Sequence, residues 1–167
     1  MSLEEAMLWY MITFALKSII MSKVTALYHI VFATKNREMT ISQLNQEKLY
    51  RFIWSEIKSS GSSLLRIGGI PNHVHILLNL NPSIALSTLV RDIKSRSSRW
   101  MKLSGDFPLF TSWAAEYYAS TISFDEKTVV IEYIKSQKEH HFGKILDEEF
   151  GALMRGAGFD YTPEDLR

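Results

Sequence analysis

Apolar side chains recur along the chain in two rhythms, at every second residue in some segments and at every third or fourth in others. The first rhythm is typical of strands with one buried face, and residues 24–34 show it, with Ile30 and Phe32 on the same side. Further strands are predicted over residues 64–70, 73–80 and 117–122. Pro71 and Asn72 separate two of them, which predicts an antiparallel hairpin.

The second rhythm predicts helices, and residues with capping preferences mark their ends. The predicted helices cover residues 42–60, 83–104, 124–142 and 145–155. Ser42 can cap the first of them, while Gly61 and Gly105 follow the last residues of the first two. Ser123 and Glu126 have the spacing of a capping box, which sets the expected start of the third helix.

The order of these elements indicates the fold class. A strand, a helix, two strands, a helix, a strand and a helix predict an α+β protein with a ferredoxin-like, or RNA-recognition-like, sandwich. We expect an antiparallel sheet with helices packed on one face. The length of 167 residues is that of one ordinary domain, and residues 23–167 are predicted to form it.

Residues 1–22 are predicted to be an apolar helical extension. Their apolar run, residues 6–16, is too short to span a bilayer, and two acidic residues precede it where a secretory leader would be basic. We expect this helix to pack on the domain or on a partner subunit. Met21 is an equally good natural start. A cytoplasmic protein without a membrane partner is the default expectation.

Composition excludes some functions, and charge needs to be examined by position. The chain has no cysteine, which excludes disulfides, thiolate zinc sites and a cysteine nucleophile. A net charge of +1 alone argues against a dedicated nucleic-acid binder. However, residues 21–137 have fourteen basic and nine acidic side chains, a balance of +5, between acidic ends. The central part of the chain is therefore mildly basic.

The basic side chains of interest lie on one predicted helix and in one loop. They are Arg91, Lys94, Arg96, Arg99 and Lys102 on the helix, and Lys35 and Arg37 in the loop. A run of charges on a helix is usually a solvated face. The alternative is a surface that binds phosphate groups.

Two histidines on one strand are the first chemical signal. His73 and His75 are two residues apart, so both rings project from the same face of the strand. Val74 and Ile76 make the other face apolar, which places the histidines opposite the core. Two converging imidazoles can hold one cation, and by ligand preference they favour zinc or manganese over magnesium. The pair is weak evidence by itself.

The second signal is on the third predicted helix. The helical spacing places one set of residues on the same face: Val129, Val130, Tyr133, Ile134, Gln137 and His141. A glutamine on an inward face needs a hydrogen-bond partner. From spacing alone, Tyr133 fits a core aromatic residue and Gln137 fits a partner of the backbone.

Four segments together resemble a known family. They read YHIVFATKNRE, IPNHVHILL, LSTLVRDIKSRSSRWM and VIEYIKSQKEHH, the last followed by EEF. In this order they resemble the small single-tyrosine HUH transposases of the insertion-sequence-200-like group, over roughly residues 24–161. Such proteins excise and insert single-stranded DNA without a DDE triad or ATP.

The resemblance implies a role for each candidate residue. His73 and His75 would be the HUH metal ligands, Gln137 the third ligand and Tyr133 the nucleophile. The cofactor would be Mg²⁺ or Mn²⁺, and cleavage would pass through a 5′-phosphotyrosine. The partner would be single-stranded DNA with a hairpin, lying across the basic helix and the loop of Lys35 and Arg37.

The resemblance also implies an assembly and a location. We expect a homodimer in which the tyrosine helix of one subunit can complete the site of the other. The protein would be cytoplasmic and nucleoid-associated when bound to DNA. Trp100, Trp113 or Tyr118 could stack on bases if exposed, although Trp100 lies on an apolar stripe that favours core packing.

One segment departs from the family pattern, and alternatives stay open. Relatives commonly have Gly-Tyr-Gly-Ala before the last strand, whereas this chain has Glu-Tyr-Tyr-Ala at residues 116–119. A domesticated relative that acts on repetitive extragenic palindromes would have the same chemistry. A non-catalytic nucleic-acid-binding module could have the same fold. A two-histidine metallohydrolase would not need Tyr133.

Overall fold

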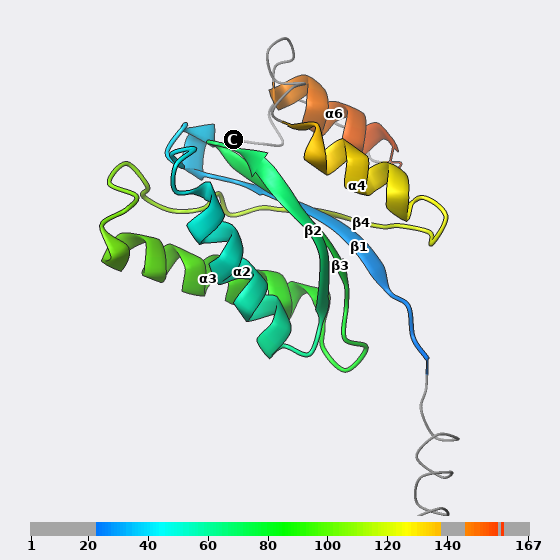
Figure 1. Ribbon diagram of the computed structural model, residues 1–167. Helices are drawn as coiled ribbons and strands as arrows, with labels where there is room; N and C mark the ends of the chain where they lie inside the picture. Colours follow the sequence, from blue (N-terminus) through cyan, green and yellow to red (C-terminus); the bar gives the residue numbers. More distant parts are fainter. Residues whose placement is uncertain (1–22, 138–145, 157, 159–167) are drawn as a thin grey trace, which may run out of the picture.

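The computed structural model describes residues 23–137, 146–156 and 158 (Figure 1). In chain order the elements are β1 (Leu27–Ala33), η1 (Lys35–Arg37), α2 (Gln46–Ser59), β2 (Ser63–Ile70), β3 (His73–Asn79), α3 (Leu86–Ser104), β4 (Tyr118–Thr121), α4 (Lys127–Lys135) and α6 (Leu146–Gly156). This order confirms the predicted alternation. The N-terminal extension and the last part of the predicted tyrosine helix, His140 and His141 included, lie outside the described residues. Every described helix is too short or too polar to cross a bilayer.

The four strands form one antiparallel sheet in the order β2-β3-β1-β4. Since α2 connects β1 to β2 and α3 connects β3 to β4, this is the split βαβ arrangement of ferredoxin-like folds. The predicted hairpin is confirmed, with Pro71 and Asn72 at the turn between β2 and β3. In the register of the central strands, Val31 lies opposite His75 and Ala33 opposite His73.

One face of the sheet packs against α2 and α3 and forms the main core, as predicted (Figure 1). The alternation in β1 and β3 directs one set of apolar side chains toward these helices. The core includes Ile30, Phe32, Leu49, Ile53, Ile57, Val74, Ile76, Leu78, Leu89, Val90, Ile93 and Met101. Full burial of one such side chain contributes about 1.5–3 kcal/mol. The fold therefore derives most of its stability from this face.

The opposite face carries the histidines and is covered in part by α4 and α6. Helix α4 contacts β2 and β3, and α6 packs Leu153 and Met154 against Val31 and Tyr118. Figure 1 shows the two short helices on the other side of the sheet from α2 and α3. The hydrophobic pattern predicted α6 as an element, but it did not predict where α6 packs.

Candidate active site

Strand β3 brings His73 and His75 to the same face of the sheet, as predicted. Both side chains are completely buried, and their ring centroids are 4.8 Å apart with the planes inclined at 69°. Val74 and Ile76 enter the core on the opposite face. The strand can hold two buried imidazoles because the alternating apolar residues anchor it from the other side.

The ring of His73 has a defined tautomer. The amide Nδ2 of Asn72 donates to the carbonyl of Arg37 at 3.2 Å, which leaves Oδ1 of Asn72 to face Nδ1 of His73 at 2.8 Å. Because an amide oxygen can only accept, the proton of a neutral His73 lies on Nδ1. The lone pair is then on Nε2, a buried atom. This is the protonation state that a metal-ligating histidine requires.

Helix α4 begins with the predicted capping box. Ser123 Oγ donates to Glu126 Oε2 at 2.7 Å, and Glu126 N donates back to Ser123 Oγ at 3.3 Å. The amide of Ser123 also donates to Glu126 Oε2 at 3.0 Å. The backbone and hydroxyl of Ser123 hold the pKa of the Glu126 carboxyl below its usual value. These bonds fix the entry of the chain into the helix.

Helix α4 places Tyr133 beside His75 and His29, and Gln137 is buried two residues beyond the end of the helix. The ring of Tyr133 meets the ring of His75 edge-on, with the centroids 5.7 Å apart. Gln137 is only 1% exposed. The prediction that both share an inward face agrees with this arrangement, but it was wrong for Val129, which is 70% exposed. The buried stripe of α4 is narrower than the spacing suggested: Ile134 is its buried residue and lies against Gly68 of β2.

Two glycines in β2 leave room for neighbouring segments of the chain. Gly68 lies opposite His75 in the register, and a Cβ there would be 2.8 Å from both Cγ2 and the carbonyl oxygen of Ile134. Gly69 has a φ of +153°, and a Cβ at this residue would collide with the carbonyl oxygen of His73. Gly68 therefore leaves room for the tyrosine helix, while Gly69 leaves room for the backbone of β3 at the turn of the hairpin.

A third histidine, which we did not predict as a site residue, belongs to this cluster. His29 of β1 is 3% exposed, and its Nε2 lies 3.1 Å from Nδ1 of His75. Its ring also meets the rings of Tyr118 and Tyr133 edge-on, with centroid distances of 6.1 Å to each. Burial lowers the pKa of His29 from 6.5 to about 4, so the ring is neutral at pH 7.

The donor set suits a divalent cation. In the described part of the chain, no three His, Asp or Glu side chains are grouped so as to hold a metal ion. A cation at this place would therefore use the imidazoles of His73 and His75 and the amide oxygen of Gln137. Two neutral nitrogen donors and one neutral oxygen donor bind Mn²⁺ or Mg²⁺ weakly and leave positions for phosphate oxygens. The residues present fit the predicted group.

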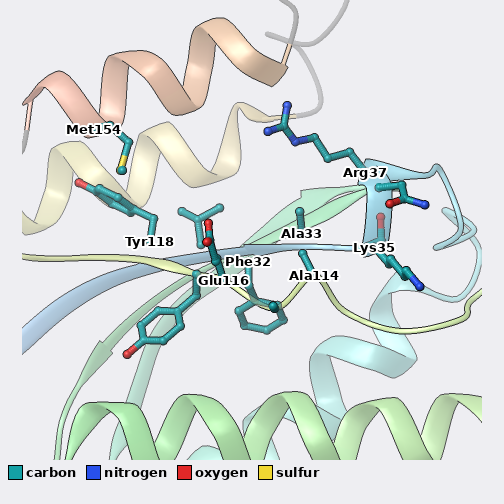
Figure 2. A pocket seen from close by; sticks show the side chains of 13 residues that line it. Phe32, Ala33, Lys35, Arg37, Ala114, Glu116, Tyr118 and Met154 are labelled. Atoms are coloured by element: carbon teal, nitrogen blue, oxygen red, sulfur yellow. The ribbon is translucent and has the colours of Figure 1, made fainter. Parts of the chain in front are cut away.

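A cavity of about 290 Å³ opens on the same face of the sheet beside the histidines. Val31 and Ala33, which line it, are the register partners of His75 and His73. Figure 2 shows Tyr118 and Met154 at one end and Lys35 and Arg37 at the other. The two predicted DNA-binding residues of the loop therefore border a hollow that leads toward the histidine cluster.

The sequence profile of the IS200-like transposases matches residues 22–137. This span is well over half of the chain and contains all four residues predicted for the site. The chain belongs to the IS200-like transposase family. The resemblance noted from the four segments is thus confirmed at the level of the family.

Similar proteins agree with this assignment. The ISDra2 transposase TnpA of Deinococcus radiodurans is 24% identical over 119 residues, which are 67% of this chain and 84% of that protein. The crystal structure of a putative transposase from Deinococcus radiodurans R1 superposes with a TM-score of 0.55 at 22% identity and covers 70% of this chain and 95% of that one. A REP-associated tyrosine transposase bound to a REP hairpin gives 0.57 at 16% identity, covering 72% and 74%. The ferredoxin-like fold is confirmed by these structures.

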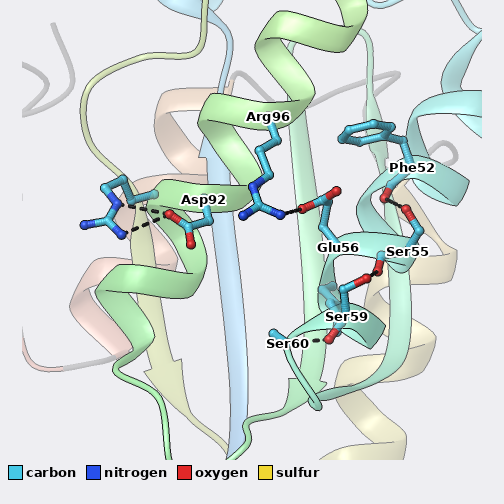
Figure 3. Close-up of polar contacts among 9 residues, drawn as sticks. Phe52, Ser55, Glu56, Ser59, Ser60, Asp92 and Arg96 are labelled. Carbon is cyan, nitrogen blue, oxygen red and sulfur yellow. Dashed lines mark hydrogen bonds and ion pairs between the residues drawn. The ribbon is translucent and has the colours of Figure 1, made fainter.

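In this IS200-like transposase, the predicted basic helix lies on the other face of the sheet from the histidines. Arg96 of α3 bonds Glu56 of α2 at 2.9 Å (Figure 3), and Arg91 pairs with Asp92 at 3.0 Å. Exposed pairs of this kind contribute little and can be exchanged for phosphate contacts. Within the described residues, Arg99 and Lys102 form no ion pair. The structure does not bring these cations together with Tyr133.

Lys94 holds the segment that lines the cavity. Its Nζ donates to the carbonyls of Ala115 and Glu116 at 2.7 and 3.2 Å. Desolvation lowers the pKa of Lys94, and the nearby charge of Glu116 opposes this shift. Residues 116–119, where the chain departs from the family pattern, continue into β4, in which Tyr118 pairs with Val31 and Ala119 with Ile30.

The aromatic residues considered for base stacking have different environments. Trp113 is 7% exposed and donates from Nε1 to Ser97 Oγ at 2.9 Å, so it is a core residue and the stacking prediction is wrong for it. Trp100 stacks on Phe52, with the centroids 4.8 Å apart, as its apolar stripe predicted. Tyr118 is also buried, but it lines the cavity.

Proposed function

We propose that this transposase cuts and rejoins single-stranded DNA with Tyr133 as the nucleophile. The observation that carries the proposal is the contact of Tyr133 with the buried ring of His75, which lies next to His73, and the burial of Gln137 one turn further along the same chain. The phenol approaches the imidazoles edge-on, and Gly68 provides the room for this approach. A core tyrosine would not need a strand glycine beneath its helix and two buried imidazoles, those of His29 and His75, against its ring.

The chain's own residues perform the covalent chemistry in two balanced steps. Tyr133 loses its phenolic proton, and its oxygen attacks the phosphorus of the scissile phosphodiester. The bond from phosphorus to the 3′ oxygen breaks, the 3′ oxygen takes up a proton, and the 5′ end stays linked to Tyr133. A second DNA 3′-hydroxyl reverses these events. No nucleotide is hydrolysed because the phosphodiester energy is conserved in the phosphotyrosine.

The same site would hold a divalent cation, Mg²⁺ or Mn²⁺, through His73, His75 and Gln137. When bound, the cation stabilises negative charge on the phosphate oxygens. His73 contributes through Nε2, since its Nδ1 donates to Asn72. The two histidines come from β3, and Gln137 lies two residues beyond the end of α4, which packs against Gly68 of β2 through Ile134.

For the DNA path, we propose that the single strand next to the scissile phosphate follows Lys35, Arg37 and the cavity beside Ala33. Lys35 and Arg37 line this cavity together with Val31 and Ala33, the register partners of His75 and His73. The structural relative bound to a REP hairpin supports a hairpin partner. The cations of α3 remain a second predicted contact, which a hairpin would reach only around the edge of the sheet or from another subunit.

The predicted homodimer remains part of this proposal. In this structure Tyr133 of α4 lies beside His75 of its own chain, which supports a site within one chain. A shared site would require α4 to move to the partner. Mixing an inactive Tyr133→Phe protein with an inactive His75→Ala protein tests this. Restored cleavage indicates sharing, whereas no restoration indicates a site within one chain.

The test of the proposed chemistry is a covalent adduct. Purified protein is incubated with Mn²⁺ and a single-stranded oligonucleotide that contains the hairpin end of its own element and a 5′-flanking sequence. We expect a denaturation-resistant protein–DNA species that Tyr133→Phe abolishes and Tyr117→Phe retains, because Tyr117 borders the cavity but lies off α4. An adduct that persists in Tyr133→Phe would contradict the proposal.

A domesticated role on repetitive extragenic palindromes is the second candidate. It is favoured by the likeness to the REP-associated transposase. The two functions share the adduct and differ in the DNA around the gene. Hairpin ends that flank the gene and are cut by the protein indicate a mobile element, whereas cleavage of dispersed palindromes only indicates a domesticated one.

A further inference from the structure

We infer that His29 is a positioning residue that fixes the tautomer of His75 and thereby makes Nε2 of His75 available as a metal ligand. The inference rests on the proposed function, because it assumes a cation at His73 and His75. It concerns a residue on a different strand, which the sequence motifs did not assign to the site.

The geometry of the two rings is that of an edge-to-edge hydrogen bond. Nε2 of His29 and Nδ1 of His75 are 3.1 Å apart. The ring centroids are 5.3 Å apart and the planes are inclined by only 19°. The bonded nitrogens therefore lie between two nearly coplanar rings, in the direction in which an N–H donates to a ring lone pair.

Only one placement of the protons in this pair allows His75 to bind a cation. A neutral imidazole has one N–H and one lone pair. If His29 donates from Nε2, the proton of His75 must lie on Nε2, and this atom cannot bind a metal. If His29 instead carries its proton on Nδ1, its Nε2 accepts from Nδ1–H of His75, and Nε2 of His75 presents its lone pair.

The two proposed ligands are thus oriented in the same way by different elements. Asn72, held by the carbonyl of Arg37, accepts from Nδ1 of His73. His29 does the same for His75 from β1. Partners of this kind typically contribute ten- to a hundredfold in metal affinity. The edge contacts of His29 with Tyr118 and Tyr133 restrict its ring, so the acceptor is held in place.

His29 does not fit the role of a third ligand. Its Nε2 faces Nδ1 of His75 rather than the Nε2 side of that ring. No group of three His, Asp or Glu side chains in the described part of the chain is arranged to hold a metal ion. His29 lies on the Nδ1 side of the His75 ring, away from the proposed metal-binding Nε2, so it acts on the metal only through His75.

Two-bond ¹H–¹⁵N spectra of the histidine rings test the inference on the unaltered protein. His29→Gln and His75→Ala proteins assign the two signals, and Mg²⁺ is the probe because it is diamagnetic. With saturating Mg²⁺, we expect His75 protonated at Nδ1 with a lone pair at Nε2, and His29 also protonated at Nδ1. A proton on Nε2 of His75 would overturn the inference.

Metal affinity gives the second measurement, by titration with Mn²⁺ alone and detection of the free ion by electron paramagnetic resonance. We expect His29→Leu to weaken Mn²⁺ binding about ten- to a hundredfold. His29→Gln, which keeps an accepting oxygen, should stay within a few-fold of wild type. Equal affinities for His29→Leu and wild type would refute the role of His29. The ring spectra decide the matter if the leucine variant does not fold.

The controls separate this inference from the proposed function. If wild type and His75→Ala bind Mn²⁺ equally, the proposed metal site is wrong and the inference falls with it. If wild type binds Mn²⁺ and forms the DNA adduct, His75→Ala does neither, and His29→Leu matches wild type in both, the proposed function stands and His29 has no positioning role.

Discussion

Strand β3 has two buried faces, and they are buried for different reasons. Ile76 packs under α2 and α3, where removal of apolar surface from water stabilises the fold. His73 and His75, on the other face, are just as completely buried. Burial of an imidazole is unfavourable unless its nitrogens are hydrogen-bonded, and Asn72 and His29 supply such bonds. One face therefore stabilises the domain, while the other sacrifices some stability to hold a site.

The largest expected difference is between substitutions of two neighbouring residues, His75 and Ile76, which lie on opposite faces of β3. His75→Ala should lower the rate of adduct formation at least about a hundredfold, as expected when a group that stabilises transition-state charge is lost. Its free energy of unfolding should change little. Ile76→Ala should instead lower the free energy of unfolding by about 2–5 kcal/mol through the cavity it leaves.

Urea denaturation and a single-turnover cleavage assay, performed on both variants at a temperature where Ile76→Ala is folded, measure the two quantities. The folded Ile76→Ala protein should cleave at close to the wild-type rate. If His75→Ala unfolds as readily as Ile76→Ala, or if Ile76→Ala loses activity while folded, the division between the faces is wrong.

The next effect tests how α4 reaches the histidine face. Gly68→Ala places a methyl group against Ile134, where the helix backbone must give way. Such overpacking costs about 1–3 kcal/mol. Because the displaced helix contains Tyr133, the activation free energy of cleavage should rise by more than the free energy of unfolding falls. Gly156→Ala, where no atom lies within 4 Å of the new Cβ, is the matched control and should leave both unchanged. Wild-type cleavage by Gly68→Ala would contradict this account.

The core face could be predicted from the sequence almost completely, because alternation and helical spacing report directly on burial. The same alternation placed His73 and His75 together and put Tyr133 and Gln137 on one side of a helix. It also places His29 on the face opposite Ile30. This alternation does not give the register between strands, because the register depends on tertiary packing. The register brings His29 next to His75.

Other features of the site depend on contacts between distant segments, which local patterns do not contain. In the sequence, Gly68 and Gly69 indicate only a weak strand. The structure shows that Ile134 of α4 lies against Gly68. Lys94 belongs to a run of positive charge, yet it bonds two loop carbonyls. The charge of a residue is visible in the sequence, whereas the partner that uses this charge is not.

A smaller effect shows which face DNA follows. The double variant Lys35→Ala with Arg37→Ala should bind a single-stranded oligonucleotide more weakly. The slope of log K against log salt concentration should become less steep by roughly 0.7 for each phosphate contact that is lost. Arg99→Ala with Lys102→Ala, on the α3 side, should leave this single-strand binding within about twofold and act only on a hairpin substrate. Fluorescence anisotropy at several salt concentrations measures both. A stronger effect of the α3 pair on the single strand would place the DNA on the core-helix side.

The last comparison is a pH dependence of the free energy of unfolding to which His29, on the histidine face, contributes. Because burial lowers the pKa of His29 from 6.5 to about 4, the unfolded chain binds a proton in this range that the folded chain does not. The free energy of unfolding should therefore fall as pH decreases from 6.5 toward 4, by up to about 1.4 kcal/mol per pH unit for this group. The groups that face His29 are His75, Tyr118 and Tyr133, and wild type and the His29→Gln variant both contain them. Urea denaturation in EDTA should show a shallower profile for His29→Gln than for wild type, and parallel profiles would mean that His29 is not held neutral in the folded state.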